Sequence, residues 1–175
     1  MQSSKRNPLT GEVHVDEFYL GQPEEQKRGR SKGEKRLVIV ALEKVQDGVG
    51  RAYAQVIESA SADDFKPFFN NYIDVNAVVV TDEWRGYLHL KNEYQHLRQV
   101  PSNEGKNFPD MHIHIMNLKG WLRGIHHHCS KEHLQGYLDE YHYRYNRRNS
   151  MNTMFDLLVK KIVDNKPIRL ITDKG

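Results

Sequence analysis

Apolar and polar residues alternate near the start of the chain with the two-residue period of a β-strand. Val13 and Val15 are each followed by a polar residue, and successive side chains of a strand point to opposite faces of a sheet. Asp16 therefore shares one face with His14 and Phe18, away from the two valines. The pattern predicts a strand that delivers a carboxylate to one side of the sheet.

Two further apolar segments predict the neighbouring strands. Residues 37–42 form a continuous apolar run, and residues 51–57 form the next segment after turn-forming residues at 46–50. A short turn between two strands makes them antiparallel. We therefore expect the first three strands to form an antiparallel meander.

A helix and a central strand are predicted next. Serine and aspartate residues at 59–64 are typical of a helix start, and aromatic side chains recur at helical spacing over 62–73, namely Phe65, Phe68, Phe69 and Tyr72. Residues 77–80 form a wholly apolar run just before Asp82, which is typical of a strand covered on both faces. Because a helix precedes this strand, we expect it to pair in parallel.

The carboxyl half of the chain is predicted to be mostly helical. Its periodicity and turn residues indicate a helix or helical turn at 84–92, a short strand at 94–100, a loop at 101–109, a helix at 112–124, a helix capped by Ser130, and a last helix at 151–163. The predicted fold class is α/β: a mixed sheet of three antiparallel strands and then parallel strands, flanked by helices.

Length and composition limit the class of protein. The chain of 175 residues fits one ordinary domain. It contains no stretch near the roughly 20 apolar residues of a membrane span and no apolar signal core, so we expect a cytoplasmic protein. The single cysteine, Cys129, excludes an internal disulfide and a cysteine-cluster zinc site. The adjacent His126, His127 and His128 cannot all face one ion from a regular helix.

Positive charge is concentrated in two zones, although the net charge is only +3. One zone lies between Lys27 and Arg36 and the other begins at Lys119. A solvated loop is the simpler explanation of the first zone, but two basic zones beside candidate acids favour contact with phosphate. The residues expected to bind DNA are Lys27, Arg28, Arg30, Lys32, Arg85, Lys119, Arg123, Arg147 and Arg148.

Asp16 and Asp82 indicate metal-dependent phosphoryl transfer. Each is attached to a predicted strand, and open sheets gather ligands at the carboxyl ends of strands. Two carboxylates from separate strands can hold the divalent ions that activate an attacking oxygen and stabilise the departing one. The sequence therefore predicts a site for Mg²⁺ or Mn²⁺, centred on Asp16 and completed by Asp82.

Three blocks of sequence resemble one family. They are Gly-Glu-Val-His-Val-Asp-Glu-Phe-Tyr-Leu-Gly at 11–21, Val-Thr-Asp-Glu-Trp-Arg-Gly-Tyr at 80–87, and His-Ile-His-Ile-Met-Asn-Leu-Lys-Gly-Trp-Leu at 112–122, followed by Ser-Lys-Glu-His-Leu-Gln-Gly-Tyr-Leu-Asp-Glu-Tyr-His-Tyr-Arg-Tyr-Asn-Arg-Arg at 130–148. In this order they resemble the ISXO-type insertion-sequence transposases, a branch of the DDE transposases. The resemblance covers residues 9–149, nearly all of the chain.

The resemblance implies a ribonuclease H-like catalytic domain at 11–150, between a tail or upstream remnant at 1–10 and a terminal helix and tail at 151–175. It implies Asp16 and Asp82 as the acidic positions, Asn117 as the third position, and two Mg²⁺ or Mn²⁺ ions when DNA is bound. Transposon ends and target DNA would be its partners, and a homo-oligomer would act on paired ends. Relatives carry a zinc ribbon that is not seen before Asp16, so we expect a catalytic core.

Several residue assignments have structural alternatives. Asn117 can satisfy its amide within its helix, which would leave Asp110 as a substitute acid. His112 and His114 can contact phosphate or serve the core. Trp84 can stack on a base or pack against the sheet.

The sequence also suggests roles for other neighbours of the candidate acids. Arg85 and Tyr87 can contact DNA beside Trp84. Glu17 and Glu83, each next to a candidate acid, are expected to point to the opposite face where their segments are extended.

Two other functions compete with an active transposase. One is a DNA-binding transposase remnant that has lost its chemistry. The other is a different nuclease with the same ribonuclease H-like fold. Metal-dependent nicking and joining of DNA distinguish the three.

Overall fold

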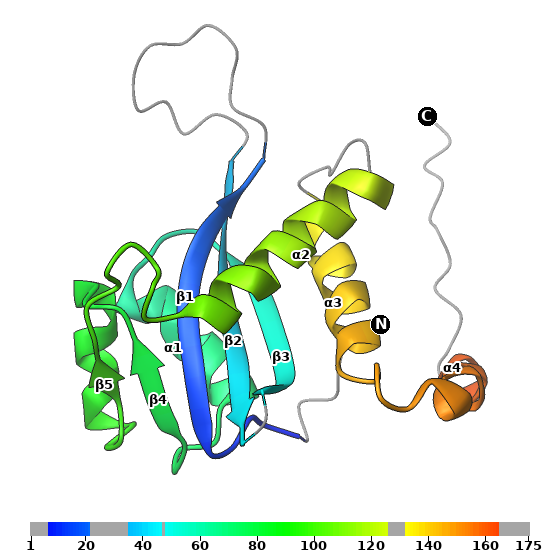
Figure 1. The fold of residues 1–175 in the computed structure, drawn as a ribbon, viewed down its shortest axis with the longest axis horizontal. Coiled ribbons are helices and arrows are strands. Elements are labelled where there is room, and N and C mark those ends of the chain that lie inside the picture. Colours follow the sequence, from blue (N-terminus) through cyan, green and yellow to red (C-terminus); the bar gives the residue numbers. More distant parts are fainter. Residues whose placement is uncertain (1–6, 22–34, 47, 126–131, 165–175) are drawn as a thin grey trace, which may run out of the picture.

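The computed structural model describes residues 7–21, 35–46, 48–125 and 132–164. The elements follow one another as shown in Figure 1: β1 (Glu12–Leu20), β2 (Arg36–Val45), β3 (Gly48–Ile57), α1 (Ala62–Tyr72), β4 (Val78–Thr81), the 3₁₀ helix η1 (Arg85–Asn92), β5 (Arg98–Gln99), α2 (Pro109–Ile125), α3 (Leu134–Tyr145) and α4 (Met151–Asp164).

The five strands form one mixed sheet in the order β3-β2-β1-β4-β5. β1 pairs antiparallel with β2, and β2 pairs antiparallel with β3. β4 lies parallel to β1, and β5 lies parallel to β4. The predicted mixed sheet is therefore confirmed, with the antiparallel meander and the parallel strand beyond it that a ribonuclease H-like domain requires.

One face of the sheet packs against α1. Val13 and Val15 of β1 are buried in the same cluster as the aromatic residues of α1, Phe65, Phe68 and Phe69. Ser61 caps α1, because its side chain accepts a hydrogen bond from the Asp64 N–H. The apolar half of the β1 alternation thus faces the core, as predicted.

The other face of the sheet is covered by α2 and α3 (Figure 1). Val38 and Val40 of β2 lie in the same buried cluster as Leu118 of α2 and Leu138 of α3. Phe18 of β1 also belongs to this cluster, so Phe18 and Asp16, two residues apart on one strand, face the α2 side. Residues 37–42 are buried throughout, which explains their continuous apolar run.

Side chains of α3 cover the outer edge of β3. The Gln135 amide accepts from Val56 N–H at 2.9 Å and donates to Ala54 C=O at 3.2 Å. The Asn146 amide makes the same pair of bonds with the N–H and C=O of Ala52, at 2.8 and 2.9 Å. These amides take the place of a sixth strand, because an edge strand otherwise leaves such groups unpaired.

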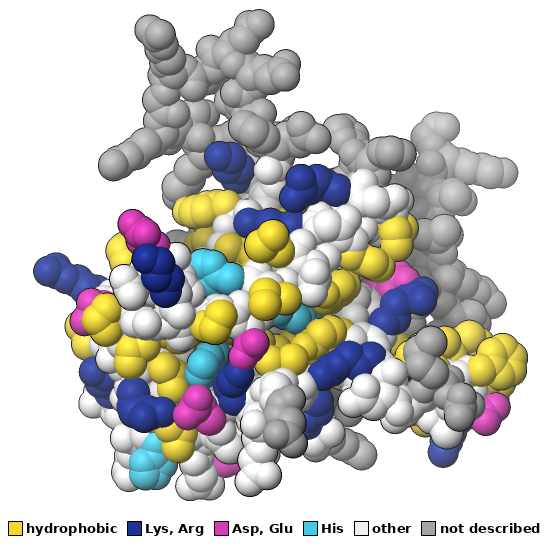
Figure 2. Space-filling model, viewed as in Figure 1, with side chains coloured by type: hydrophobic (Ala, Val, Ile, Leu, Met, Phe, Trp, Pro, Cys, Tyr) yellow, Lys and Arg dark blue, Asp and Glu magenta, His cyan; other side chains and the backbone are white. Residues whose placement is uncertain are grey.

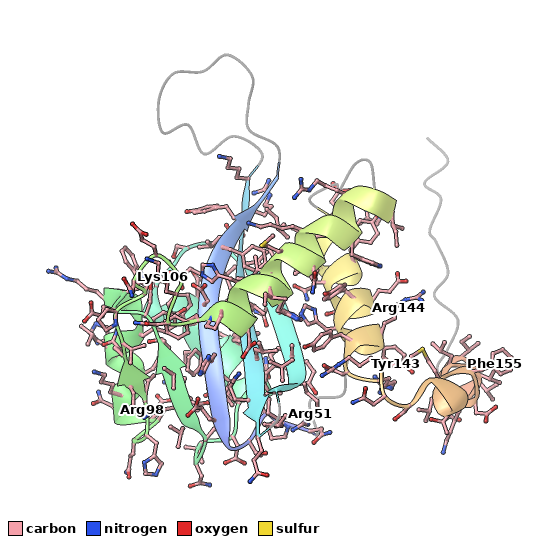
Figure 3. The ribbon with its side chains drawn as sticks, viewed as in Figure 1. Arg51, Arg98, Lys106, Tyr143, Arg144 and Phe155 are labelled. Carbon is pink, nitrogen blue, oxygen red and sulfur yellow. The ribbon has the colours of Figure 1, made fainter. Side chains whose placement is uncertain are left out.

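An ion pair joins β2, β3 and the segment that precedes β1. Arg51 lies at the lower end of the sheet (Figure 3), where its Nη2 is 2.8 Å from Glu43 Oε1 and 2.9 Å from the Pro8 carbonyl. Burial raises the pKa of Glu43, but hydrogen bonds from Arg51 and Thr10 outweigh it and hold that pKa below its ordinary value. The charge of Glu43 is thus kept at a nearly buried position.

The carboxyl half confirms one local prediction and shortens another. The segment predicted as a helix or helical turn at 84–92 is a 3₁₀ helix, whereas the strand predicted at 94–100 shrinks to the two residues of β5. The predicted cap Ser130 lies outside the described residues, and α3 begins at Leu134.

The last helix, α4, stands apart from the sheet (Figures 1 and 3). Its residue Phe155 is 74% exposed, and Ile162 and Val163 are also exposed. Among the described helices, none has the length and apolar character needed to cross a membrane.

Candidate active site

Asp16 and Asp82 lie side by side on neighbouring parallel strands. β1 and β4 pair in a register that sets His14 opposite Val80, and two more residues along each chain bring Asp16 level with Asp82. Neighbouring strands are about 4.8 Å apart. The structure therefore brings together the two acids that the sequence singles out, although 65 residues lie between them.

Burial and neighbouring charges both act on Asp16. Burial raises the pKa of this carboxyl, and the negative charge of Asp82 raises it further. The Glu17 N–H, which donates to Asp16 Oδ1 at 2.8 Å, acts in the opposite direction, as do the charges of His112 and Lys119. A bound cation stabilises the negative charge of two adjacent carboxylates.

Asp82 is held by a turn at the end of β4. Its Oδ1 accepts from the Trp84 N–H at 3.0 Å, and its carbonyl oxygen accepts from the Gln99 amide at 3.0 Å and from the Thr81 hydroxyl at 2.9 Å. Gln99 belongs to β5, so the short strand serves to anchor this turn. The carboxylate is thereby positioned by the sheet instead of by a free loop.

Glu17 faces the opposite side of the sheet from Asp16. Its Oε2 accepts from the Tyr87 hydroxyl at 2.5 Å. Burial raises the pKa of Glu17 to about 7, against the effect of the Tyr87 hydrogen bond, and the charges of Asp82 and Asp16 raise it further. This confirms the expected direction of Glu17. It also excludes Tyr87 as a DNA contact, because that ring is fully buried.

Helix α2 turns two polar residues toward Asp16. His112 and Lys119 are seven residues apart, nearly two turns, so they lie on one face of the helix. Lys119 Nζ lies 5.0 Å from the centre of the Phe18 ring. The His112 ring fills the space over Gly105, where a Cβ would come within 2.0 Å of it. The two residues therefore line the α2 side of the candidate site.

Asn117 lies on a different face of α2. It follows His112 by five residues, which is about 140° around the helix axis, and its side chain is exposed. The predicted role of Asn117 stays a prediction. His112 instead lies on the face that approaches Asp16, and its seven-residue spacing to Lys119 is the sequence signal for that shared face.

The described residues contain no group of three His, Cys, Asp or Glu side chains placed to hold a metal ion. The donor set at the site is instead a pair of carboxylates. Such a pair fits Mg²⁺, which is commonly bound by one or two carboxylates together with waters and substrate phosphates. The chemistry of Asp16 and Asp82 thus suits a divalent ion that shares its coordination with DNA.

Two other polar candidates from the sequence belong to the framework. His114 is buried, and its Nε2 lies 3.1 Å from Nε2 of His142 on α3. Asp110 forms an ion pair with Lys44 near the end of β2, whereas Asp16 is level with Val40, four residues earlier on that strand. Asp110 is therefore not a substitute acid for this site.

Four of the predicted DNA-binding residues lie outside the described residues, namely Lys27, Arg28, Arg30 and Lys32. The candidate metal ligands His126, His127, His128 and Cys129 also lie outside them. Arg85 and Arg123 are exposed, and Lys119 is partly exposed. Figure 2 shows basic and apolar side chains mingled on the face that α2 forms.

Arg147 and Arg148 are occupied within the protein. The Arg147 guanidinium lies 3.7 Å from the centre of the Tyr143 ring, and that of Arg148 lies 4.1 Å from the Tyr145 ring. Arg148 also donates to the carbonyl oxygens of Val49 and Gly50. Arg148 thus links the end of α3 to β3, and the predicted contact of both arginines with DNA stays a prediction.

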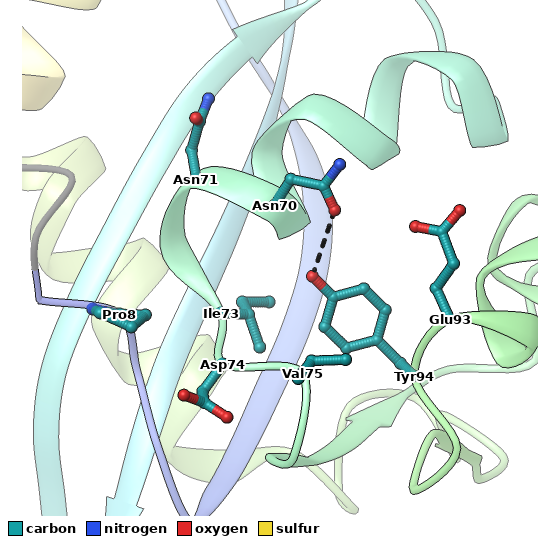
Figure 4. Close-up of a pocket in the computed structure, with 8 residues that line it drawn as sticks. All are labelled: Pro8, Asn70, Asn71, Ile73, Asp74, Val75, Glu93 and Tyr94. Atoms are coloured by element: carbon teal, nitrogen blue, oxygen red, sulfur yellow. Dashed lines mark hydrogen bonds between the residues drawn. The ribbon is translucent and has the colours of Figure 1, made fainter.

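A separate pocket of about 340 Å³ lies at the opposite end of the sheet (Figure 4). Pro8, which precedes β1, lines it together with Asn70 at the end of α1 and Tyr94. The Tyr94 hydroxyl approaches Asn70 Oδ1 at 3.5 Å. Because Asp16 and Asp82 lie toward the carboxyl ends of β1 and β4, this pocket is not part of the candidate site.

The model of the ISXO2-like transposase domain matches residues 8–146. Among curated proteins, none matches the chain. The structure of the HTLV-2 integrase catalytic core domain in complex with magnesium, in its dimeric form, resembles the chain with a TM-score of 0.39 and 14% identity, over 76% of this chain and 86% of that one.

Proposed function

Because the chain belongs to the ISXO2-like transposase domain family, we propose that it is the catalytic core of a DDE-type transposase that cuts DNA and joins strands in a metal-dependent reaction. One observation carries the proposal beyond the family. Asp16 on β1 and Asp82, the residue that follows the parallel strand β4, come level when the register of His14 with Val80 is extended by two residues, and the charge of Asp82 acts on Asp16.

Asp16 and Asp82 would hold Mg²⁺ or Mn²⁺, with two ions when DNA is bound. When present, the ions lower the pKa of an attacking water or 3′-hydroxyl and stabilise the departing 3′ oxygen. The fixed turn around Asp82 supports this role, because a ligand that is already held loses little freedom when the ion binds.

The charges along α2 would position the scissile phosphate. Lys119 faces the carboxylate pair and is held near the Phe18 ring. Arg123 follows Lys119 by one helical turn, so its charge extends the same basic edge. Lysine and arginine neutralise phosphate and fix the register of the backbone without reading the sequence.

The third position on α2 has two candidates. The family resemblance indicates Asn117, an amide that offers an oxygen but no charge. Of the two, His112 is the residue whose charge acts on Asp16, and its imidazole suits contact with a phosphate or an attacking water more than with Mg²⁺. Separate alanine variants of these residues distinguish the two.

The proposed partners are transposon ends and target DNA in the cytoplasm. A homo-oligomer would hold two ends together during joining. Family membership supports DNA as the substrate.

A nicking assay with labelled duplex DNA tests the function. We expect cleavage with Mg²⁺ or Mn²⁺, loss of cleavage with EDTA, and loss in Asp16→Asn. Joining of a 3′-hydroxyl end to a target duplex then separates a transposase from a simple nuclease. If DNA binds but is never cut under any metal condition, the chain is the DNA-binding remnant.

A further inference from the structure

Trp84 combines a large exposed apolar surface with an unusually fixed position. Its side chain is 48% exposed, although indole is one of the largest apolar groups in a protein. It follows Asp82 by two residues, at the start of η1. The residue is therefore exposed to solvent and lies close in the chain to one acid of the candidate active site.

Three hydrogen bonds fix Trp84. The indole Nε1–H donates to the Ala60 carbonyl at 2.8 Å, and the backbone N–H donates to Asp82 Oδ1 at 3.0 Å. The backbone carbonyl accepts from the Gln99 amide at 3.0 Å. One residue is thus tied to the end of β3, to the acid and to β5.

Gly86 makes room for the indole edge. A Cβ at this position would lie 2.9 Å from Trp84 Nε1 and 2.7 Å from the Ala60 carbonyl oxygen. Such contacts would force the indole away from its acceptor. The local sequence Trp-Arg-Gly-Tyr therefore builds a seat for the ring and leaves one of its surfaces in water.

The chemistry around the ring indicates its ligand. Arg85, the next residue, is exposed, and the charge of Lys119 acts on Asp16 from the α2 side of the sheet. An aromatic surface beside cations is the combination that binds single-stranded nucleic acid, because bases stack on the ring while the cations neutralise the backbone. A second copy of this chain would also bury the ring, but it would not need the adjacent positive charge.

We propose that Trp84 is a stacking platform for an unpaired nucleobase next to the phosphate held at Asp16 and Asp82. The inference rests on the proposed function, since it takes DNA as the ligand. It adds a substrate preference: DNA with an unpaired nucleotide at the cleavage point binds more tightly than a fully paired duplex. Because Trp84 donates to Asp82, base binding and the position of the acid are linked.

Tryptophan fluorescence tests the stacking directly. The chain has two tryptophans, so Trp121→Phe leaves Trp84 as the only reporter. Titration with a labelled oligonucleotide that has one unpaired nucleotide near its end, in EDTA to prevent cleavage, is expected to quench the emission. The quenching should saturate together with the fluorescence anisotropy of the DNA label.

Affinity measurements provide a second test that does not need Trp121→Phe. Trp84→Ala should weaken binding of the unpaired-nucleotide DNA about tenfold, the scale of one base–aromatic stack, and Trp84→Phe should restore most of it. Leu88→Ala is the matched control, because Leu88 is also on η1 and is 47% exposed. Circular dichroism checks that each variant is folded.

The outcomes separate the inference from the proposed function. If anisotropy reports DNA binding while Trp84 emission and the Trp84→Ala affinity are unchanged, the stacking platform is wrong and the transposase proposal stands. If quenching follows protein concentration without DNA, the ring is covered by a second copy and the inference is overturned. If no DNA binds at all, both proposals fail.

Discussion

His114 and His142 share a hydrogen bond of 3.1 Å between their Nε2 atoms, inside the contact of α2 with α3. His142 Nδ1 lies 2.7 Å from the Leu138 carbonyl, so Nδ1 carries a proton and Nε2 of the neutral ring accepts. His114 then donates from Nε2. A proton on both Nε2 atoms would break this bond, so the two rings cannot both be charged, and burial disfavours a charge on either ring.

The histidine pair predicts a loss of stability in mild acid. Burial lowers the pKa of His114 to about 3, helped by the charge of His142, and lowers that of His142 to about 4. An unfolded histidine titrates near 6.5, so the unfolded state binds more protons below that pH. The stabilising contribution is complete above pH 6.5 and is lost as the pH falls toward 4.

Urea unfolding at pH 7.5 and pH 5 measures this effect. We expect the free energy of unfolding to drop more between these pH values in the wild type than in His142→Gln, which cannot take up the proton. His96→Gln, at an exposed position, is the control. Equal pH dependence in wild type and His142→Gln would contradict the prediction.

The raised pKa of Glu17 predicts a loss of stability as the pH rises, opposite to the effect of the histidine pair. Its pKa is raised from 4.5 to about 7, so the folded state retains a proton that the unfolded state releases. The protein is then stabilised below pH 4.5 and loses that contribution as the pH rises through 7. Glu17→Gln should raise the free energy of unfolding at pH 8 by about 1 kcal/mol, the usual size of a single-residue effect, and should have little effect at pH 4.

Two measurements check the role of Glu17. Chemical denaturation at pH 4 and pH 8 gives the stability difference, and Tyr87→Phe serves as the companion variant because it removes the hydrogen bond but keeps the carboxyl. If Glu17→Gln raises the free energy of unfolding equally at both pH values, the Glu17 carboxyl does not titrate as described.

Asn146 predicts a large stability effect at the sheet edge. Replacement by Ala leaves the N–H and C=O of Ala52 without their partners, at a cost of about 1–3 kcal/mol. Arg144→Ala is the matched control on the same helix, because its ion pair with Glu140 is exposed and such pairs contribute at most about 1 kcal/mol. Similar urea midpoints for both variants would argue against the edge-covering role.

The two candidates on α2 for the third residue of the site, His112 and Asn117, can be distinguished by the nicking rates of their alanine variants. His112→Ala should lower the rate about tenfold or more if His112 contacts the phosphate or the attacking water. Asn117→Ala at the wild-type rate would remove Asn117 from the site. The reverse pattern would instead support the position implied by the family resemblance.

Local signals predicted much of this fold. The alternation around Val13 and the aromatic spacing in 62–73 each mark the buried side of one element, and both sides lie in the same core. The period and composition of each segment were therefore sufficient to predict the element and its buried side. The position of Asp82 followed from the apolar run before it. These features are set within a few residues along the chain.

Other features depended on how separate segments meet. The face of α2 that approaches Asp16 is fixed by packing of the whole helix, so the sequence alone did not favour His112 over Asn117. His114 and His142 are 28 residues apart, and neither position shows its partner. Arg148 donates to Val49 and Gly50 at the start of β3, a segment that no local pattern connects to α3, whereas Arg147 contacts Tyr143 four residues earlier in the chain.

The amides that α3 places along β3 also restrict how molecules of this protein can associate. Gln135 and Asn146 bind the backbone groups of β3 to which a strand from another copy would have to bind. At the opposite edge of the sheet, β5 has only two residues with which another strand could pair. Within the part of the chain that the structure describes, growth of the sheet across a dimer is therefore unfavourable. Pairing on two DNA ends would have to use helices or the DNA itself, which leaves the strands that carry the two acids undisturbed by assembly.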